Sequence, residues 1–391
     1  MPQTNLPKLP VYLDYAAATP VDPRVIEAMV HCLSRDGTFA NPSSKDHVYG
    51  WQAAEAVENA RGEIADLVGA SPLEIVFTSG ATESNNLAIM GLAKALREKG
   101  DKRRSIVTTL IEHKAVLEAC EILEQEGYHV TYLAPRADGT VDAQLLAPAL
   151  NDDVFLVSIA QGNSVTGAVS DMHALATLCR QKGIYYHSDC AQTIGYEKFD
   201  LDKSDISLVS LTPEKICGPK GVGALYINRA QQVPLAPMIV GGGQERGLRG
   251  GTVPTHQVVG MGKAFALMAS EGKADKERLN ALRAKLIALL QAGTDCRVNG
   301  SAEHHLPHIL SVTFPGIDGA MLLPSLRATA CSSGSACSSA DLKPSYVLTA
   351  MGLNDADARA SLRLSVGRFT TEEDIERAAQ DIIATVNKLK R

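Results

Sequence analysis

The chain has 391 residues, of which 45% are hydrophobic and 21% charged, and its formal net charge is −6. This length favours two domains, and the slightly acidic balance argues against a nucleic-acid-binding or membrane-surface protein. No stretch resembles a signal peptide or a membrane span, so we expect a cytoplasmic protein. The eight cysteines lack CxxC spacing, so neither a disulfide framework nor a zinc site is indicated, and most should be buried, inert thiols.

Strand-like apolar runs alternate with helix-like segments through the first two-thirds of the chain. The runs are 74–79, 105–109, 129–133, 154–159, 184–189, 206–210 and 223–227, and the helices expected between them include 85–99, 115–125 and 172–182. This alternation predicts a mostly parallel sheet flanked by helices. Such sheets bind ligands at the carboxyl ends of their strands, so the residues that follow each run are the candidates for chemistry.

The pattern changes after about residue 255. A long helix is expected over 256–291, short strands over 309–314 and 360–364, and a terminal helix over 371–390. We interpret residues 15–255 as a large domain. Residues 1–14 and 256–391 would then form a smaller α+β domain, in which the N-terminal segment packs against the C-terminal part.

Lys215 lies between an apolar run and a turn rich in glycine and proline, and a second apolar run follows. A protein would hold an amine rigidly in such a place to form a Schiff base with a carbonyl cofactor. A lysine taken alone is more often a surface residue in a turn.

The segment 78–85, which contains Ala81 and Thr82, follows an apolar run and opens a helix. Its small residues let backbone N–H groups approach an anion, and a helix N-terminus favours negative charge, so the segment is a candidate phosphate site. An ordinary N-cap is about equally consistent with it.

Asp189 ends another apolar run, where a buried carboxylate needs a partner such as a protonated pyridine nitrogen; its alternative role is to cap the next helix. His113 begins a helix after the run 105–109. It could stack on a cofactor ring and exchange protons, although a single histidine is more often a capping or solvated residue.

Residues 330–339 are small and carry two thiols, Cys331 and Cys337. An accessible thiol in a segment rich in glycine and serine suits nucleophilic attack, whereas the alternative is a serine-rich turn with incidental cysteines. Arg363 lies in an expected strand and could clamp a substrate carboxylate, although a structural ion pair is the commoner use of such an arginine.

The order and the amino-acid sequences of these segments resemble those of the pyridoxal-phosphate-dependent cysteine desulfurases of the NifS/IscS type, in the class V aminotransferase group. The likeness covers nearly the whole chain, through segments 12–17, 40–44, 80–83, 223–226, 241–257, 333–337, 343–348 and 367–372. It implies the type I fold of PLP-dependent transferases, with a mostly parallel seven-stranded sheet in the large domain and a smaller α+β domain.

The resemblance also implies a role for each matching residue. Lys215 would be the Schiff-base lysine, Asp189 the partner of the pyridine nitrogen, and His113 the stacking acid/base. Cys337 would be the nucleophile. The remaining cofactor contacts would come from Ala81, Thr82, Ser164, Gln192, Thr212 and Thr252, and the substrate contacts from Asn41 and Arg363.

The implied reaction converts L-cysteine to L-alanine and leaves the sulfur as a persulfide on Cys337, for transfer to an acceptor protein. Thr252 would reach the phosphate of the other subunit, which implies a homodimer with shared sites. The acceptor could serve iron–sulfur clusters, tRNA thiolation or DNA phosphorothioation. The sequence stops short of the tail with which housekeeping members dock the iron–sulfur scaffold, so a specialised acceptor is a credible alternative.

The chain departs from the family pattern close to the expected site. Glu214 stands where a histidine usually precedes the lysine, Ser164 replaces an asparagine, and Val165 replaces a glutamate. A carboxylate beside a phosphate is repulsive unless it turns away or is protonated, so we expect altered cofactor affinity or turnover with the reaction class retained. The alternatives are a selenocysteine-lyase-like or other PLP lyase, and a degenerate paralogue that acts as a scaffold.

Overall fold

The computed structural model describes residues 9–333 and 344–390. Its centre is a seven-stranded sheet with the order β2-β8-β7-β6-β5-β3-β4, in which only the pairs made by β8 are antiparallel. Its strands are β2 (Ile75–Thr78), β3 (Ser105–Thr109), β4 (His129–Leu133), β5 (Val154–Ser158), β6 (Tyr185–Asp189), β7 (Leu208–Leu211) and β8 (Gly223–Ile227). The seven expected strands and the mostly parallel sheet are confirmed.

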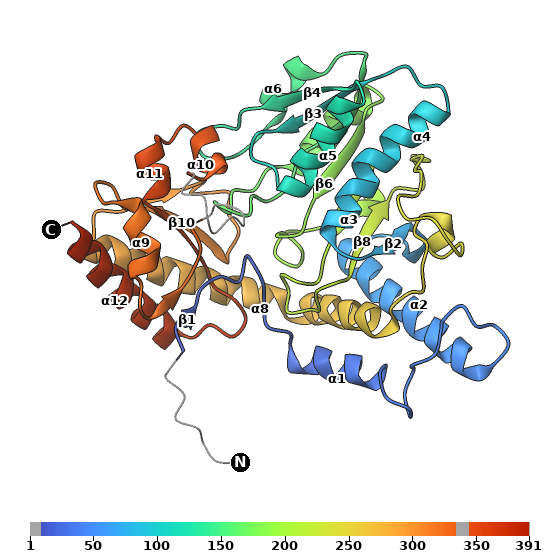
Figure 1. The fold of residues 1–391 in the computed structure, drawn as a ribbon, viewed down its shortest axis with the longest axis horizontal. Helices are drawn as coiled ribbons and strands as arrows, with labels where there is room; N and C mark the ends of the chain where they lie inside the picture. Colours follow the sequence, from blue (N-terminus) through green and yellow to red (C-terminus); the bar gives the residue numbers. More distant parts are fainter. Residues whose placement is uncertain (1–8, 334–343, 391) are drawn as a thin grey trace.

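Helices cover both faces of this sheet (Figure 1). The helices of this part of the chain are α1 (Pro23–His31), α2 (Val48–Val68), α3 (Ala81–Asn86), α4 (Leu92–Glu98), α5 (Lys114–Gln125), α6 (Ala143–Leu146) and α7 (Met172–Gln181). Of these, α1 packs against the later helix α8 (Thr255–Gly293) and lies away from the sheet. A π-helical turn, Leu87–Gly91, joins α3 to α4, so the helix expected over 85–99 begins four residues earlier than predicted.

Successive residues of the central strands point into different apolar clusters. Ile106 of β3 packs with buried residues of α4 and α5, while its neighbour Val107 packs with buried residues of α2 and α7. This is the alternation that a strand imposes when both of its faces are covered, and it explains why β2, β5 and β7 consist of buried residues throughout.

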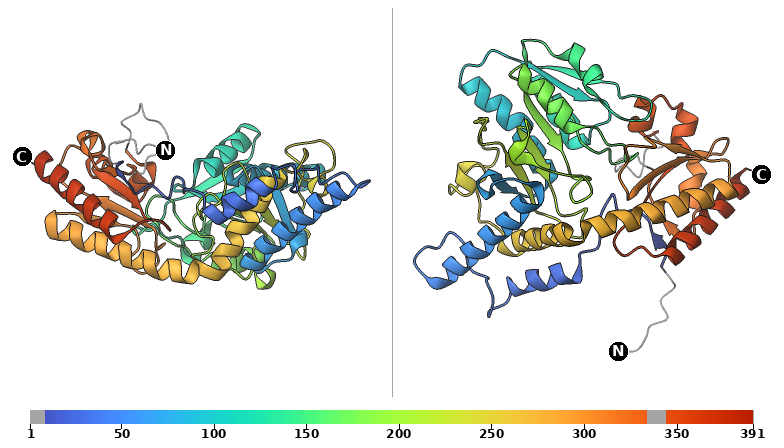
Figure 2. Two further views of the ribbon diagram at one scale, coloured as in Figure 1. Left: turned by 90° about the horizontal axis from the view of Figure 1, so that it is seen from below. Right: turned by 180° about the vertical axis from the view of Figure 1, so that it is seen from behind.

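The C-terminal part begins with the long helix α8 (Thr255–Gly293), which runs along the molecule from the large sheet to the second sheet (Figures 1 and 2). That antiparallel sheet has the order β12-β10-β9, and the N-terminal β1 pairs with β11 beside it. The remaining elements are β1 (Val11–Tyr12), β9 (Arg297–Asn299), β10 (Ile309–Thr313), α9 (Gly319–Ser325), β11 (Thr329–Ala330), α10 (Tyr346–Ala350), α11 (Asp355–Arg359), β12 (Ser361–Ser365) and α12 (Glu372–Leu389).

One apolar cluster runs through both parts of the chain. It joins Ile64 and Val209 of the large sheet region to Leu310 and Ile382 of the C-terminal region. The pairing of β1 with β11 places the N-terminal segment against the C-terminal part, while the division at residue 255 stays a prediction. Within the described residues, none of the helices is both long and apolar enough to cross a membrane.

Candidate active site

The predicted site residues follow strands that end at the same edge of the large sheet. β2, β3, β5, β6 and β7 all point the same way, because β8 is antiparallel to both of its neighbours. Asp189 is the last residue of β6, Thr212 follows β7 and His113 lies four residues beyond β3. The carboxyl ends of parallel strands therefore bring together residues that lie a hundred positions apart in sequence.

Lys215 lies in a tight turn after β7. Its Nζ donates to the carbonyl oxygen of Ala17 at 2.5 Å and to the Oε1 atom of Glu214 at 2.9 Å. The turn is held by Thr19, whose hydroxyl donates to the Glu214 carbonyl and accepts the amide of Cys217. The lysine side chain is 15% exposed, so the amine is fixed in a mostly enclosed position and is not the freely solvated residue of the alternative interpretation.

The unusual Glu214 carboxylate points toward the amine of its neighbour. Its side chain is 30% exposed, and it forms an ion pair with Lys215. The amine of Lys215 thus neutralises the charge of the Glu214 carboxylate. The expectation that Glu214 alters cofactor affinity stays a prediction.

Asp189 is a buried carboxylate without a cationic partner among the described residues. Its Oδ2 atom accepts from the amide of Asn85 at 2.7 Å, and its Oδ1 atom accepts the backbone N–H of Ala191. The Oδ1 atom of Asn85 has no partner in the described part of the chain. Burying a charged carboxylate without a positive partner is energetically unfavourable, and Asp189 is only 8% exposed. Its position therefore indicates that a bound ligand supplies a cationic group beside it.

His187, two residues earlier on β6, is fully enclosed. Its ring nitrogens contact the hydroxyls of Ser158 at 2.8 Å and Ser210 at 3.0 Å. Burial lowers the pKa of His187 to about 4, so the ring is neutral and cross-links β5, β6 and β7. This link holds the strand that ends in Asp189.

His113 is the N-cap of α5 and is exposed. Its Nδ1 atom accepts the backbone N–H of Ala115 at 3.1 Å, so in the neutral ring the proton is on Nε2. The histidine therefore does cap a helix, as the alternative interpretation held. The same bond fixes the tautomer of the neutral ring and leaves its Nε2–H free to donate.

The neighbouring Glu112 is buried, and burial raises its pKa to about 8. Its carboxyl group accepts from the hydroxyl of Thr109 and from the amide of Ala160. Its carbonyl accepts from the hydroxyl of Tyr346 at 2.7 Å. Glu112 thus links the loop after β3 to the loop after β5 and to α10.

Gln192 connects the large sheet to the N-terminal segment. Its Nε2 atom donates to the carbonyl of Ala16 at 2.9 Å, and its Oε1 atom lies 3.2 Å from Nε2 of His308. His308 is buried, stacks on Tyr196, and has no partner for Nδ1 among the described residues. The Ala16 carbonyl can only accept, so it fixes which end of the Gln192 amide carries the oxygen, and His308 then donates to that oxygen from Nε2.

Arg363, on β12, faces the same region. Its Nη2 atom pairs with Asp14 at 2.8 Å, its Nη1 atom donates to the carbonyl of Ser164 at 3.1 Å, and its buried Nε has no partner in the described part of the chain. The ion pair of the alternative interpretation is therefore present, and it holds the guanidinium beside Ser164. The backbone of Arg363 also bonds Ser332 in both directions.

Cys337, the predicted nucleophile, lies outside the described residues. The described chain stops at Ser333 and resumes at Pro344. Both flanks touch the site, because Ser332 pairs with Arg363 and the hydroxyl of Tyr346 reaches the carbonyl before His113.

The described cysteines are free thiols, five of them buried and two partly exposed. Burial raises the pKa of Cys331 to about 12, which leaves it in the inert thiol form at neutral pH. The thiols of Cys120, Cys179 and Cys190 have pKa values raised to about 12 in the same way. The expectation that most cysteines are buried is confirmed for the described chain. No group of its described residues could hold a metal ion.

The phosphate candidate is the turn from β2 into α3. Gly80 adopts φ 152° and ψ 175° and provides no side-chain cap for α3. A Cβ on Gly223 of β8 would lie 2.7 Å from the Gly80 backbone, so only glycine allows this approach. The N-terminal amides of α3, which include those of Ala81 and Thr82, are therefore not occupied by the N-cap residue.

A buried ion pair between α2 and the segment 241–251 holds the strand β2 that leads into this turn. Arg61 of α2 binds Glu245 through two hydrogen bonds of 2.8 and 2.9 Å, with the two side chains 5% and 3% exposed. Glu245 also accepts the amide of Phe77 in β2 at 2.7 Å. Arg249 pairs with Glu83 of α3 at 3.1 Å, so the glycine-rich segment 241–251 is attached to the turn at two points.

Two predicted residues remain apart from this network. No hydrogen bond or ion pair of the described residues joins Asn41 or Thr252 to Lys215, Asp189 or Arg363. Both are exposed. The connection between α1 and α2, which contains Asn41, lies at the end of the molecule opposite β12 (Figures 1 and 2). That Asn41 contacts the substrate stays a prediction.

Comparisons with known proteins agree with this arrangement. Residues 11–378 match the family described as aminotransferase class-V. The protein named cysteine desulfurase IscS from Proteus mirabilis is 49% identical over 383 residues, which cover 98% of this chain and 94% of the relative. The IscS of Escherichia coli strain K12/DH10B matches with the same identity and coverage.

The chain belongs to the class-V aminotransferase family, among the cysteine desulfurases. Among solved structures, a NifS-like protein superposes with a TM-score of 0.89 at 34% identity and covers 97% of this chain and 100% of its own. SspA in complex with cysteine has a TM-score of 0.82 at 38% identity, covering 92% and 99%. DndA from Streptomyces lividans has a TM-score of 0.77 at 41% identity, covering 90% and 99%. The family and the fold inferred from the sequence are thereby confirmed.

Several members of the network carried no recognised signal in the sequence. Asp14 and the Ala16–Ala17 carbonyls lay within a segment noted for family likeness, and Asn85 lay within the candidate phosphate segment 78–85, but the partners of these groups were not foreseen. His308 had no signal at all, because a histidine before a strand is not distinctive. Its role emerges only from the packing of β10 against Gln192.

Proposed function

We propose that the protein is a PLP-dependent cysteine desulfurase that moves sulfur from L-cysteine to Cys337. The observation that carries the proposal is the meeting of an enclosed lysine amine with an unpaired buried carboxylate at one sheet edge. Cysteine desulfurases among the relatives at 49% identity support it. The solved neighbour described as SspA in complex with cysteine supports the choice of substrate.

The residues present fit the cofactor. Asp189 is buried and unpaired with any described cation, so a protonated pyridine nitrogen would satisfy it. Lys215 would hold the cofactor covalently, and the uncapped start of α3 with Thr82 and Thr212 would take the phosphate. Ser164, Gln192 and His113 would line the ring. When bound, PLP withdraws electrons from the substrate so that its sulfur becomes a leaving group.

The chain's own residues supply binding and proton movement. Arg363 would bind the substrate carboxylate, since its guanidinium is already oriented by Asp14 and the Ser164 carbonyl. The Nε2–H of His113 and the amine of Lys215 are the groups placed to hold or move protons.

The sulfur step uses the thiolate of Cys337. It attacks the substrate sulfur, an S–S bond forms and the substrate C–S bond breaks with its electron pair left on carbon. Protonation of that carbon yields alanine, and the enzyme keeps a Cys337 persulfide. An acceptor protein or thiol then removes the terminal sulfur.

We further propose a homodimer whose sites draw on both chains. Large apolar side chains are exposed on α1 and the connection to α2, where Leu33 is 61% and Phe39 is 53% exposed, and Val240 is 79% exposed. Exposed apolar surface of this kind is typical of an interface. A second chain would also allow Thr252 to reach the phosphate of the other subunit, as the family resemblance implies.

The test is to incubate the cofactor-loaded enzyme with L-cysteine and to measure alanine, sulfide and the Cys337 persulfide by mass spectrometry. We expect equal amounts of alanine and sulfane sulfur, and loss of both in Cys337→Ala. Cys331→Ala is the matched control and should behave as the wild type, because its thiol is buried. Alanine formation that persists in Cys337→Ala would favour a different lyase mechanism. A failure to bind PLP together with no alanine would leave the scaffold alternative.

A further inference from the structure

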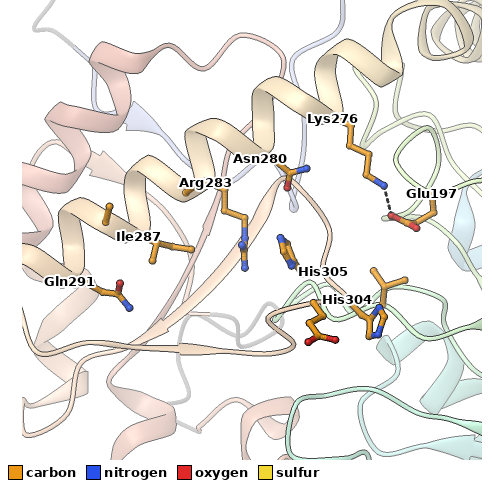
Figure 3. A pocket seen from close by; sticks show the side chains of 12 residues that line it. Glu197, Lys276, Asn280, Arg283, Ile287, Gln291, His304 and His305 are labelled. Atoms are coloured by element: carbon orange, nitrogen blue, oxygen red, sulfur yellow. Dashed lines mark hydrogen bonds and ion pairs between the residues drawn. The ribbon is translucent and has the colours of Figure 1, made fainter.

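A groove of about 670 Å³ lies between the second half of α8 and the loop that joins β9 to β10. Its lining contains none of the predicted site residues. Figure 3 shows Arg283 extending from α8 toward the loop that carries His304 and His305, with Lys276 and Glu197 at one end.

Arg283 is the notable residue of this groove, because it is a buried cation without an anion. Its residue is 9% exposed, and its Nε–H donates to the carbonyl of Ile309 at 2.9 Å. No carboxylate pairs with it among the described residues, whereas the similarly buried Arg61 has Glu245. Burial lowers the pKa of Arg283, yet a guanidinium stays charged at neutral pH. The Nη atoms of Arg283 are not among the fully buried atoms that lack a partner, so they face the groove, where an anion would pair with them.

The neighbouring groups leave Arg283 available. The Nδ1 atom of His305 has no partner in the described part of the chain. Lys276 already engages Glu197 at 2.9 Å, which removes that carboxylate from competition. Glu303 also lines the groove, but it is exposed and makes no ion pair with Arg283 in the described chain. Arg283 is therefore the cation of the groove that no carboxylate of the described chain engages.

Part of the wall is apolar or small, while Asn280, Gln291 and His304 are its other polar side chains. Ala284, Ile287 and Ala288 follow Arg283 along α8, and Val169 forms part of the opposite side. A ligand that pairs with Arg283 and also packs against these apolar side chains of α8 has a charged head and a short hydrocarbon chain. The volume suits a small molecule.

We propose that this groove binds a small amphiphilic carboxylate, whose carboxylate group pairs with Arg283 and whose chain lies against Ala284, Ile287 and Ala288. A carboxylate matches the planar guanidinium through two parallel hydrogen bonds. The site is separate from the cofactor and substrate residues and does not depend on the desulfurase activity.

The probes are hexanoate, acetate and inorganic phosphate, titrated into the cofactor-loaded protein by calorimetry. Bound PLP fills the proposed phosphate site at the start of α3, so binding of inorganic phosphate at that site does not add to the measured heat. We expect hexanoate to bind with a Kd of about 1 mM, and acetate to bind roughly tenfold more weakly because it lacks the apolar chain. Phosphate should bind no more tightly than acetate, since it gains nothing from the apolar wall.

Two matched variants locate the site. Ala284→Glu places a carboxylate in the groove wall beside Arg283, whereas Ala281→Glu adds the same charge at an exposed position of the same helix outside the lining. We expect hexanoate affinity to fall about tenfold or more in Ala284→Glu and to stay at the wild-type value in Ala281→Glu. Ile287→Ser should weaken hexanoate and leave acetate unchanged.

The proposal is wrong if hexanoate fails to bind the wild-type protein at concentrations well above the expected Kd. It is equally wrong if Ala284→Glu binds hexanoate as well as Ala281→Glu does, because the bound molecule would then occupy another site. A preference for phosphate over hexanoate would replace the amphiphilic carboxylate with a simple anion and would also overturn it.

Discussion

Replacing Glu245 with alanine should destabilise the protein and loosen the turn that we assign to the cofactor phosphate. Glu245 binds Arg61 through two hydrogen bonds and accepts the amide of Phe77, the residue before Thr78 at the end of β2. The substitution removes all three bonds together. It also leaves the guanidinium of Arg61 buried with only Ile75's carbonyl and a weak exposed partner.

The expected size follows from the burial of the pair. Both side chains are at most 5% exposed, and removing one member of such a buried pair costs about 3–5 kcal/mol, mostly from the stranded charge. For a chain of 391 residues, the unfolding entropy near the midpoint is roughly 0.8 kcal/mol per degree. The midpoint should therefore fall by about 4–6 °C.

The assay is thermal unfolding followed by circular dichroism, together with the cofactor content after dialysis. Glu58→Ala is the matched control, because Glu58 also pairs with Arg61, at 3.1 Å, but is 63% exposed. That contact should contribute under about 1 kcal/mol and leave the midpoint nearly unchanged. The double variant Arg61→Met with Glu245→Leu should recover much of the loss, since no buried charge remains. Equal midpoints for Glu245→Ala and Glu58→Ala would refute the reasoning.

Three further predictions concern the site itself. Burial raises the pKa of Glu112 to about 8 from 4.5, so the folded protein holds a proton that the unfolded chain releases, and the free energy of unfolding should fall as pH rises from about 5 to 8. In Glu112→Gln it should fall less steeply, and identical pH profiles of the two proteins in urea unfolding would contradict this. Arg363→Lys should raise KM for cysteine roughly tenfold with unchanged cofactor content, because the bidentate clamp is lost; an unchanged KM would exclude that role. Glu214→Gln should release Lys215 from its ion pair and improve cofactor retention up to about fivefold, measured by absorbance after dialysis, and equal retention would show that this carboxylate is neutral toward the cofactor.

Much of the fold could be predicted from the sequence, because its signals are local. The apolar runs and the helical spacing between them predicted the seven strands of the large sheet and the long helix now seen as α8. The rule that ligands gather at the carboxyl ends of parallel strands selected Asp189 and the turn at Lys215. The start of α3 was missed by four residues, because residues 81–84, which the prediction left in the turn before the helix, already belong to the helix that Gly80 precedes.

The partners of these residues could not be predicted, because they come from distant parts of the chain. Arg363 pairs with Asp14, 349 positions away, and Glu245 pairs with Arg61, 184 positions away. Neither partner has a local pattern that marks it, and an exposed ion pair would have the same sequence. Only the packing of the N-terminal segment against β12 and of the segment 241–251 against β2 decides these contacts.

The sequence by itself located the strand ends, since periodicity is a property of short segments. Its resemblance to the cysteine desulfurases indicated the reaction class and selected Lys215 as the candidate Schiff-base residue. The tertiary structure decided how the site is supported: an amine held by the Ala17 carbonyl, a Gln192 amide oriented by the Ala16 carbonyl, and an arginine oriented by Asp14. It also decided that Arg283 is buried without a counterion among the described residues, which no sequence pattern shows. The reason is physical, because burial and charge pairing depend on which elements meet in space.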